Sequence, residues 1–324
     1  MRFATIGSNF IVHRFLEAAR EVEGLEYTAA YSRDENTAKT LASQYGAKKT
    51  YTDLEQMAQD DEIEMVYIAS PNALHWAQAI LMMGNGKHVL CEKPIASNSA
   101  ELKKMQKIAD ENNVVLMEAM KSVHCTGYSA VSENLHKLGV IRNVTFNFLQ
   151  YSSRYDNYKN GIIENAFKPE LSNGALMDIG VYTIHMLLSL FGEPTHKKAS
   201  AIKLSNGADA AGSIICEYDT FIATLIYSKI ATFEGNQIQG ELGTMLIDKI
   251  SDIKNVEIIY RDGTKEVIPI DKKVTMVYEI EKFISFVQNK NANLSEILDV
   301  SNKQMKFLDE VRAELDIVFP ADRV

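Results

Sequence analysis

The chain of 324 residues has little of the residue types that mark several special classes of protein. It holds 3 cysteines and 6 prolines, too few for a disulfide framework or a collagen-like chain. The cysteines, Cys91, Cys125 and Cys216, show no C-x-x-C spacing and no histidine at zinc-ligand spacing from any pair. We therefore expect buried free thiols and no metal site.

Positive charge is also in short supply. Lys and Arg number 34 against 43 Asp and Glu, a formal net charge of −9, and no basic block interrupts the chain. A phosphate backbone would find little to bind, so no nucleic-acid partner is expected. No apolar run approaches the roughly 18 residues of a membrane span, and no secretory signal precedes the first strand. The sequence thus predicts a cytoplasmic protein without membrane contact.

The pattern that is present is that of an α/β protein with two domains. Over residues 1–120, short apolar strands alternate with amphipathic helices, as in parallel βαβ units. The strands predicted there are 2–7, 25–32, 65–69, 88–91 and 114–118. We expect this first domain to form a doubly wound parallel sheet that binds a dinucleotide.

After residue 120 the pattern changes to longer β-type runs joined by short turns. The predicted strands are 140–151, 199–204, 213–218, 221–230, 237–241, 244–247 and 256–260. The predicted helices are 128–138, 176–190, 274–288 and 294–315. Consecutive strands with short turns predict that residues 121–324 form an α+β domain with a large, mainly antiparallel, open-faced sheet. Both alternating sets of side chains in strand 221–227 are apolar, which favours a homo-oligomer, most simply a dimer built on that sheet.

A candidate cofactor turn follows the first strand. The segment Gly7-Ser8-Asn9-Phe10-Ile11 leads into a helix, where a dinucleotide site directs backbone N–H groups at a pyrophosphate. Of the pattern G-x-G-x-x-G it keeps the first glycine, with Asn9 and Val12 at the other two positions. An ordinary strand-to-helix turn is the alternative interpretation.

The end of the second predicted strand bears on which dinucleotide binds. There the chain reads Tyr31-Ser32-Arg33, with no acid where an NAD enzyme places one for the ribose hydroxyls. Asp34 is better placed to cap the next helix. The arrangement favours NADP(H), with NAD(H) as an alternative, and Arg33 as a plain solvated cation is the competing interpretation.

A second candidate site follows the fourth predicted strand. Glu92-Lys93-Pro94 comes directly after that strand, so Lys93 stands at the carboxyl edge, where doubly wound sheets bind ligands. The segment Ser70-Pro71-Asn72 and His75 follow the third strand in the same way. Taken alone, a surface turn with an ion-paired lysine would explain Lys93 as well.

A polar stripe in the second domain is the third candidate. Asp178, Tyr182 and His185 follow one another at helical spacing and lie along one face. A tyrosine phenol can give or take a proton when a cation lowers its pKa, and Lys93 is the candidate cation if the two domains share a cleft. A half-buried core tyrosine and a helix N-cap at Asp178 are the alternatives.

These segments, in this order, resemble the Gfo/Idh/MocA family of NAD(P)-dependent sugar and polyol oxidoreductases over essentially the whole chain. The resemblance implies a Rossmann domain, and it implies that Lys93 lies near the nicotinamide and the reacting oxygen. Asp178 and the acid/base Tyr182 take the family's two other catalytic positions, with tyrosine as in its dihydrodiol and glucose-fructose branch. The cofactor-binding residues that it implies include Ser70, Pro71, Asn72, His75, Glu92 and Lys93. The family's usual Arg after Glu118-Ala119 is missing, which leaves Lys121 and His124, with His185, as candidate substrate contacts.

The reaction implied is reversible hydride transfer between the nicotinamide and a carbon bearing a hydroxyl or carbonyl group. Tyr182 would move the proton and Lys93 would stabilise the phenolate or alkoxide. A sugar-like or dicarbonyl small molecule is the expected substrate. A catalytically silent NADP(H) sensor and a nucleotide-binding transferase are the competing hypotheses. The joint presence of Lys93, Asp178 and Tyr182 favours the enzyme, because a sensor needs no proton donor beside the nicotinamide.

Overall fold

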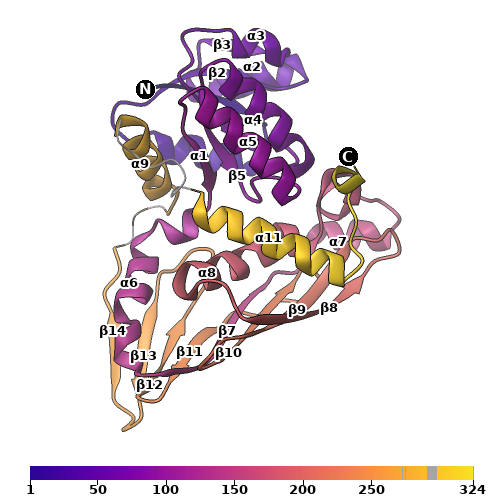
Figure 1. The fold of residues 1–324 in the computed structure, drawn as a ribbon. Coiled ribbons are helices and arrows are strands. Elements are labelled where there is room, and N and C mark those ends of the chain that lie inside the picture. Colours follow the sequence, from indigo (N-terminus) through magenta and orange to yellow (C-terminus); the bar gives the residue numbers. More distant parts are fainter. Residues whose placement is uncertain (272, 274, 290–297, 324) are drawn as a thin grey trace. The chain divides into compact units, whose positions relative to one another are not determined.

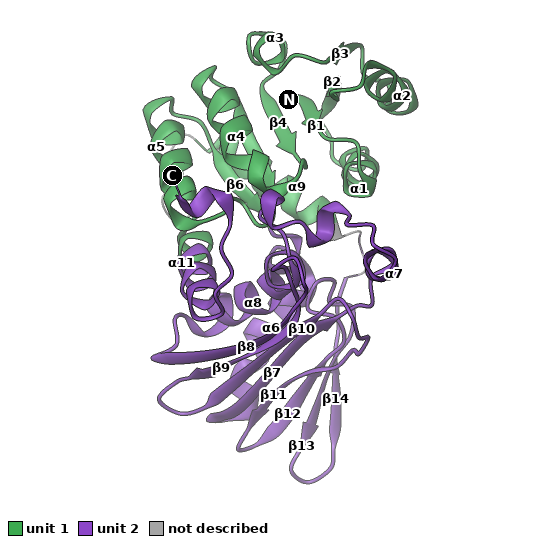
Figure 2. Cartoon of the chain, turned by 90° about the vertical axis from the view of Figure 1, so that its right-hand side faces the viewer, with its two compact units in different colours: residues 1–119, 276–302 green, residues 120–275, 303–324 purple. Residues whose placement is uncertain are grey.

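The computed structural model describes residues 1–271, 273, 275–289 and 298–323 (Figure 1). The chain divides into two compact units, shown in different colours in Figure 2. Unit 1 consists of Met1–Ala119 and Met276–Asn302, and unit 2 of Met120–Thr275 and Lys303–Val324. The predicted helices 274–288 and 294–315 begin at residues that lie outside the described part of the chain.

Unit 1 contains a six-stranded parallel sheet in the order β3-β2-β1-β4-β5-β6. Its strands are β1 (Arg2–Ile6), β2 (Glu26–Tyr31), β3 (Lys49–Tyr51), β4 (Met65–Ile68), β5 (His88–Glu92) and β6 (Leu116–Ala119). Strand β4 is buried on both faces, as expected of a central parallel strand. The order reverses between β1 and β4, which creates the crevice where such sheets bind ligands. The predicted doubly wound fold is confirmed.

Helices cover both faces of this sheet. They are α1 (Phe10–Ala19), α2 (Glu35–Tyr45), α3 (Leu54–Ala58), α4 (His75–Gly84), α5 (Ser99–Glu111) and α9 (Thr275–Gln288). Helices α4 and α5 lie side by side (Figure 1), and α4 packs on β4 and β5. On the other face, residues of α1, α2 and α9 share one apolar core with the strands.

Helix α9 reaches unit 1 from the far end of the chain. Met276, Val277, Ile280 and Phe283 are buried in the unit 1 core. The sequence assigns this segment to the second domain because it follows the antiparallel strands without a break. Its apolar face, however, is buried in the core of the parallel sheet. The helix therefore belongs to unit 1 because of its packing, although it follows the strands of unit 2 in the chain.

Unit 2 is built on an eight-stranded sheet in the order β14-β13-β12-β11-β7-β10-β9-β8, in which β7 and β10 run parallel and the other neighbours antiparallel. Its strands are β7 (Ile141–Leu149), β8 (His196–Lys203), β9 (Asp209–Glu217), β10 (Ile222–Ser228), β11 (Asn236–Gly240), β12 (Gly243–Ile247), β13 (Val256–Tyr260) and β14 (Lys265–Ile268). The predicted mainly antiparallel sheet is confirmed.

One face of this sheet carries the helices of unit 2. The α-helices are α6 (Thr126–Asn134), α7 (Ser153–Lys159), α8 (Val181–Phe191) and α11 (Asp299–Glu314), whose first residues belong to unit 1. Short helical segments are η1 (Asn72–Leu74) in unit 1 and η2 (Lys121–Val123), η3 (Leu135–Leu138), η4 (Asn165–Phe167), η5 (Pro169–Leu171), η6 (Leu176–Gly180) and η7 (Pro320–Arg323) in unit 2.

Helix α8 and the π-helix η6 pack on β7 and β10. On the opposite face Ile202, Ile215 and Ile222 are about half exposed, so the sheet is open-faced as predicted.

One segment, Pro169–Phe191, is long and apolar enough to span a membrane by length and composition. Our expectation that no run approaches that length is therefore wrong. The segment has a mean hydropathy of 1.5, and 78% of its apolar window is buried inside the protein. Such burial is typical of a core helix in a globular protein.

Candidate active site

Gly7 follows β1 and has a conformation that requires glycine. Its φ is +117°, and a Cβ there would lie 2.6 Å from the Ala69 carbonyl oxygen at the end of β4. The turn therefore brings β1, β4 and the start of α1 together at the carboxyl edge of the sheet. Ser8, Asn9 and Phe10 follow and are exposed there. A tight turn here is the role of the first glycine in a dinucleotide-binding pattern, so the turn fits a dinucleotide.

Asn9 replaces the second glycine of the pattern and makes its own set of contacts. Its Oδ1 accepts hydrogen bonds from the N–H groups of Ile11 (3.0 Å) and Val12 (3.4 Å), which caps α1. Its Nδ2 donates to the Ala69 carbonyl at 2.9 Å. The side chain thus ties the helix start to β4 and occupies two of the helix's N-terminal donors.

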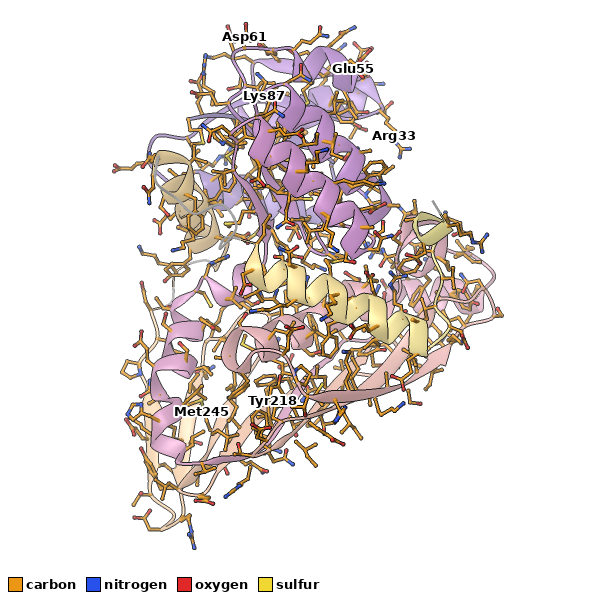
Figure 3. The ribbon with its side chains drawn as sticks, viewed as in Figure 1. Arg33, Glu55, Asp61, Lys87, Tyr218 and Met245 are labelled. Atoms are coloured by element: carbon orange, nitrogen blue, oxygen red, sulfur yellow. The ribbon has the colours of Figure 1, made fainter. Side chains whose placement is uncertain are left out.

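The end of β2 presents an exposed cation. Arg33 is exposed and extends outward from the turn (Figure 3). Asp34 caps α2, since its Oδ1 accepts from the Thr37 N–H (2.8 Å) and hydroxyl (2.6 Å). These hydrogen bonds hold the pKa of Asp34 below its usual range. With Asp34 committed to the cap, Ser32 and Arg33 are left as the polar groups suited to a phosphate.

Buried side chains hold the loop around Lys93 from two sides. Lys93 itself is half-buried, and its N–H donates to the Glu92 carboxylate at 3.3 Å. Glu92 also accepts from the Tyr67 hydroxyl at 2.5 Å. On the other side, the Ile95 N–H donates to Glu118 Oε1 at 3.0 Å. The backbone that carries Lys93 is therefore fixed by carboxylates from β5 and β6.

His75 completes the support of this loop. It is 1% exposed, and its ring nitrogens lie 2.9 Å from the carbonyl oxygens of Pro94 and Ser70. Burial lowers the pKa of His75, against the pull of these two carbonyls. The buried ring thus links the loop that carries Pro94 to the loop that carries Ser70. Ser70 in turn donates to Gln78 Oε1 at 2.7 Å.

In unit 2, the predicted stripe divides into one accessible and two buried residues. Asp178 lies in the π-helix η6, and its side chain is 31% exposed. Tyr182 in α8 is 8% exposed, with its ring centroid 5.4 Å from that of Phe148. His185 is 4% exposed and its Nδ1 lies 2.7 Å from Gln304 Oε1, which makes His185 a core residue. The wider π turn changes the register between Asp178 and α8.

Lys229, which the sequence analysis did not single out, pairs with Asp178. Its Nζ lies 2.6 Å from Asp178 Oδ2, and its side chain is 4% exposed. The available signal was a lysine at the end of an apolar strand, a weak signal without knowledge of its partner. Lys121 and His124, the candidate substrate contacts, are half-buried in and just after η2. Among the described residues, no group of three or more His, Cys, Asp or Glu side chains is arranged to hold a metal ion.

Doubly wound sheets bind dinucleotides outside the carboxyl ends of their strands, and here that edge carries both the glycine turn and the fixed lysine. The class of protein that this defines is the dinucleotide-dependent oxidoreductases. Residues 1–120 match the model of the oxidoreductase family with an NAD-binding Rossmann fold, and residues 134–245 match the GFO/IDH/MocA C-terminal domain. The chain belongs to the Gfo/Idh/MocA family, as its motif order predicted.

Among curated proteins, the chain is similar to scyllo-inositol 2-dehydrogenase (NADP(+)) IolU of Bacillus subtilis, with 47% identity over 100% of this chain and 99% of the relative. It is also similar to trans-1,2-dihydrobenzene-1,2-diol dehydrogenase of Xenopus laevis, with 27% identity over 91% of each chain. Among solved structures, a complex of the 3-ketoreductase KijD10 of Actinomadura kijaniata with NADP and TDP-benzene has a TM-score of 0.87 at 22% identity, covering 97% of this chain and 98% of that one. This last likeness shows the fold.

Proposed function

We propose that the protein catalyses reversible hydride transfer between NADP(H) and a carbon bearing a hydroxyl or carbonyl group in a polyol or sugar. A cyclic polyol of the inositol type is the first candidate, because the relative with 47% identity over its full length is named an inositol dehydrogenase. The observation that carries the proposal is that the loop bearing Lys93 is held in place by contacts with Glu92, His75 and Glu118.

The residues of unit 1 suit NADP(H). Gly7 makes the tight turn between β1 and α1, where a pyrophosphate would bind, and Ser8 and Phe10 are exposed beside it. Ser32 and Arg33 would bind the phosphate on the adenosine ribose. When bound, NADP(H) supplies or accepts the hydride at its nicotinamide ring.

Three side chains would act on the substrate. The Lys93 ammonium binds the reacting oxygen and stabilises negative charge on it. The Tyr182 phenol gives that oxygen a proton during reduction and takes one during oxidation. Asp178 accepts a hydrogen bond from a substrate hydroxyl and so orients the ring. Support for these roles comes from each unit by itself and from the order of the motifs along the chain.

The experiment is a set of nicotinamide absorbance measurements. The purified protein is incubated with NADP⁺ or NAD⁺ and inositols, D-xylose, D-glucose or a trans-dihydrodiol, and with NADPH and the corresponding ketones. Turnover with an inositol and NADP⁺ is expected. Binding of NADPH by fluorescence with no turnover on any member of the panel would contradict the enzyme and favour a sensor.

We further propose a cytoplasmic homodimer formed through the open face of the eight-stranded sheet. Ile202, Ile215 and Ile222 on that face are 58%, 49% and 50% exposed, which supports a second copy of the chain as its cover. Cys91, Cys125 and Cys216 are buried free thiols, which fits a reducing compartment.

A further inference from the structure

Lys229 is a buried cation next to a partly exposed carboxylate. It follows β10, and its ammonium makes three contacts within unit 2. The ion pair with Asp178 measures 2.6 Å, the hydrogen bond to the Ala166 carbonyl 3.1 Å, and the distance to the centroid of the Phe167 ring 5.2 Å. An ammonium excluded from water stays charged where such contacts replace its hydration. Lys229 is therefore built into the protein as a fixed positive charge.

In the Lys229–Asp178 pair the cation is the more deeply buried partner. Lys229 is 4% exposed and Asp178 31% exposed, so the cation lies behind the carboxylate and the carboxylate faces accessible space. Arg312 makes a further pair of this kind, with Asp309 and Asp322 in the carboxyl-terminal segment. Lys229 instead contacts Asp178, which we propose above to bind a substrate hydroxyl.

A second carboxylate near Lys229, that of Asp209, is buried. Asp209 at the start of β9 is 1% exposed, and its Oδ2 accepts from the N–H of Leu176, the first residue of η6, at 2.6 Å. Burial raises the pKa of Asp209 to about 6, while the charge of Lys229 acts to lower it. The groups that face Lys229 are thus Asp178 from η6, Asp209 from β9 and the aromatic ring of Phe167 from η4, with the Tyr227 phenol of β10 beside Asp209.

We propose that Lys229 is a positioning residue of the reaction, which keeps the Asp178 carboxylate ionised and in one orientation for a substrate hydroxyl. An ionised carboxylate accepts hydrogen bonds from hydroxyls, whereas its protonated form offers a donor at one oxygen. The contacts with Ala166 and Phe167 fix the ammonium, and the ammonium fixes Asp178. This inference rests on the proposed function and deepens it.

The first test is Lys229→Met, which removes the charge and keeps an apolar chain of similar length. Without a cation at 2.6 Å the carboxylate becomes easier to protonate. We expect kcat/KM to fall by about 10- to 100-fold and the acidic limb of its pH profile to move to higher pH. NADPH affinity, a property of unit 1, should not change. Lys87→Met is the matched control, because Lys87 is also buried but donates to the Asp60 carbonyl in unit 1 (Figure 3).

Two further variants separate the positioning role from a structural one. If Lys229 acts through Asp178, then Lys229→Met adds little to the loss caused by Asp178→Asn, so the two effects are not additive. Asp209→Asn should leave the acidic limb in place, because the limb belongs to Asp178. Additive losses, or disappearance of the limb in Asp209→Asn, would overturn the proposal.

Lys229→Arg keeps the test decisive if the methionine variant does not fold. Arginine retains the positive charge. The acidic limb of the kcat/KM pH profile of Lys229→Arg should therefore stay at the wild-type pH, even if kcat falls. A limb displaced to higher pH in a folded Lys229→Arg protein would contradict the inference. The proposed function fails separately, if the wild-type protein turns over no substrate of the panel. An active wild type whose Lys229→Met variant keeps both rate and pH profile refutes the role of Lys229 alone.

Discussion

Tyr182 is the residue on which the proposed proton transfer depends. Tyr182→Phe removes the phenolic oxygen and keeps the ring next to Phe148. General acid–base catalysis contributes typically ~10²–10⁴-fold, so we expect kcat to fall within that range. NADPH affinity, measured by fluorescence titration, should stay near the wild-type value. A variant with nearly full activity would disprove the assignment, and His124 would be the next candidate to test.

We expect Arg33 to set the preference between the two nicotinamide dinucleotides. A charge-assisted contact to the ribose phosphate is worth ~1.5–3 kcal/mol, so Arg33→Ala should weaken NADP(H) binding by about 10- to 100-fold. NAD(H) binding should change little. Arg20→Ala serves as control, because Arg20 lies over the Tyr45 ring and donates to the Gln44 carbonyl. Calorimetric titration that finds both dinucleotides weakened equally by Arg33→Ala would count against the assignment.

At the scale of single residues, the sequence pointed to residues that belong to local motifs. It missed contacts between residues that are far apart in the chain. Lys93, Asp178 and Tyr182 stand in motifs that can be read directly. Lys229 contacts Asp178, and Glu118 contacts the loop of Lys93, across long stretches of chain, so neighbouring residues do not reveal these contacts. Burial of His185 was equally hidden, because helical spacing gives the face but not which face is covered.

At the scale of elements, long periodic segments were predictable and short or polar ones were not. The edge strands β3 (Lys49–Tyr51) and β14 (Lys265–Ile268) were missed because each has few residues and weak apolar alternation. The turn before β14 contains Asp262-Gly263, and Gly263 has φ +85° as such a turn requires. Helix α7 has no buried residue, so no apolar stripe could reveal it.

The start of α1 offers a test of one element. Asn9→Ala removes both the cap and the contact with Ala69, whereas Asn9→Ser keeps a capping oxygen and loses the amide. Loss of an N-cap costs ~0.5–2 kcal/mol, and Asn9→Ala should lower the free energy of unfolding by at least that amount. Asn9→Ser should lose less. Urea denaturation measures both, and equal stability of wild type and Asn9→Ala would show that the cap contributes nothing.

At the scale of the whole molecule, stability should carry the signature of buried Asp209. Burial raises the pKa of Asp209 from 3.8 to about 6, so its protonated form stabilises the fold at low pH and this contribution is lost as the pH rises through 6. Asp209→Asn keeps an acceptor for Leu176 and cannot ionise. The free energy of unfolding of Asp209→Asn minus that of wild type should therefore increase by on the order of 2–3 kcal/mol from about pH 4 to pH 7.

The matched control for Asp209 titrates with the opposite sign. The pKa of Asp60 is lowered to about 2, because its hydrogen bonds with Lys49, Glu62 and Tyr51 outweigh burial. Its stabilisation is lost only as the pH falls below its unfolded value toward 2. The difference between Asp60→Asn and wild type should therefore be constant above about pH 5. Equal pH slopes for wild type and Asp209→Asn in urea unfolding would refute the titration of Asp209.

The open sheet face gives a prediction about assembly. Ile222→Glu places a charge on the open face that forms the proposed dimer interface, so sedimentation velocity should find a monomer where the wild type sediments as a dimer. Val318→Glu is the control, because Val318 is 54% exposed and lies after α11, outside the strands of the sheet. A wild-type monomer at micromolar concentration would contradict the interface.

Helix α9 has a consequence for how the protein is made. A ribosome delivers the six strands of the parallel sheet long before it delivers Met276, Val277, Ile280 and Phe283, which belong to the core of that sheet. While unit 2 is being synthesised, the apolar surface of unit 1 that α9 covers in the native protein is therefore still uncovered. The native core of unit 1 closes only after the last strand of the other unit has been synthesised.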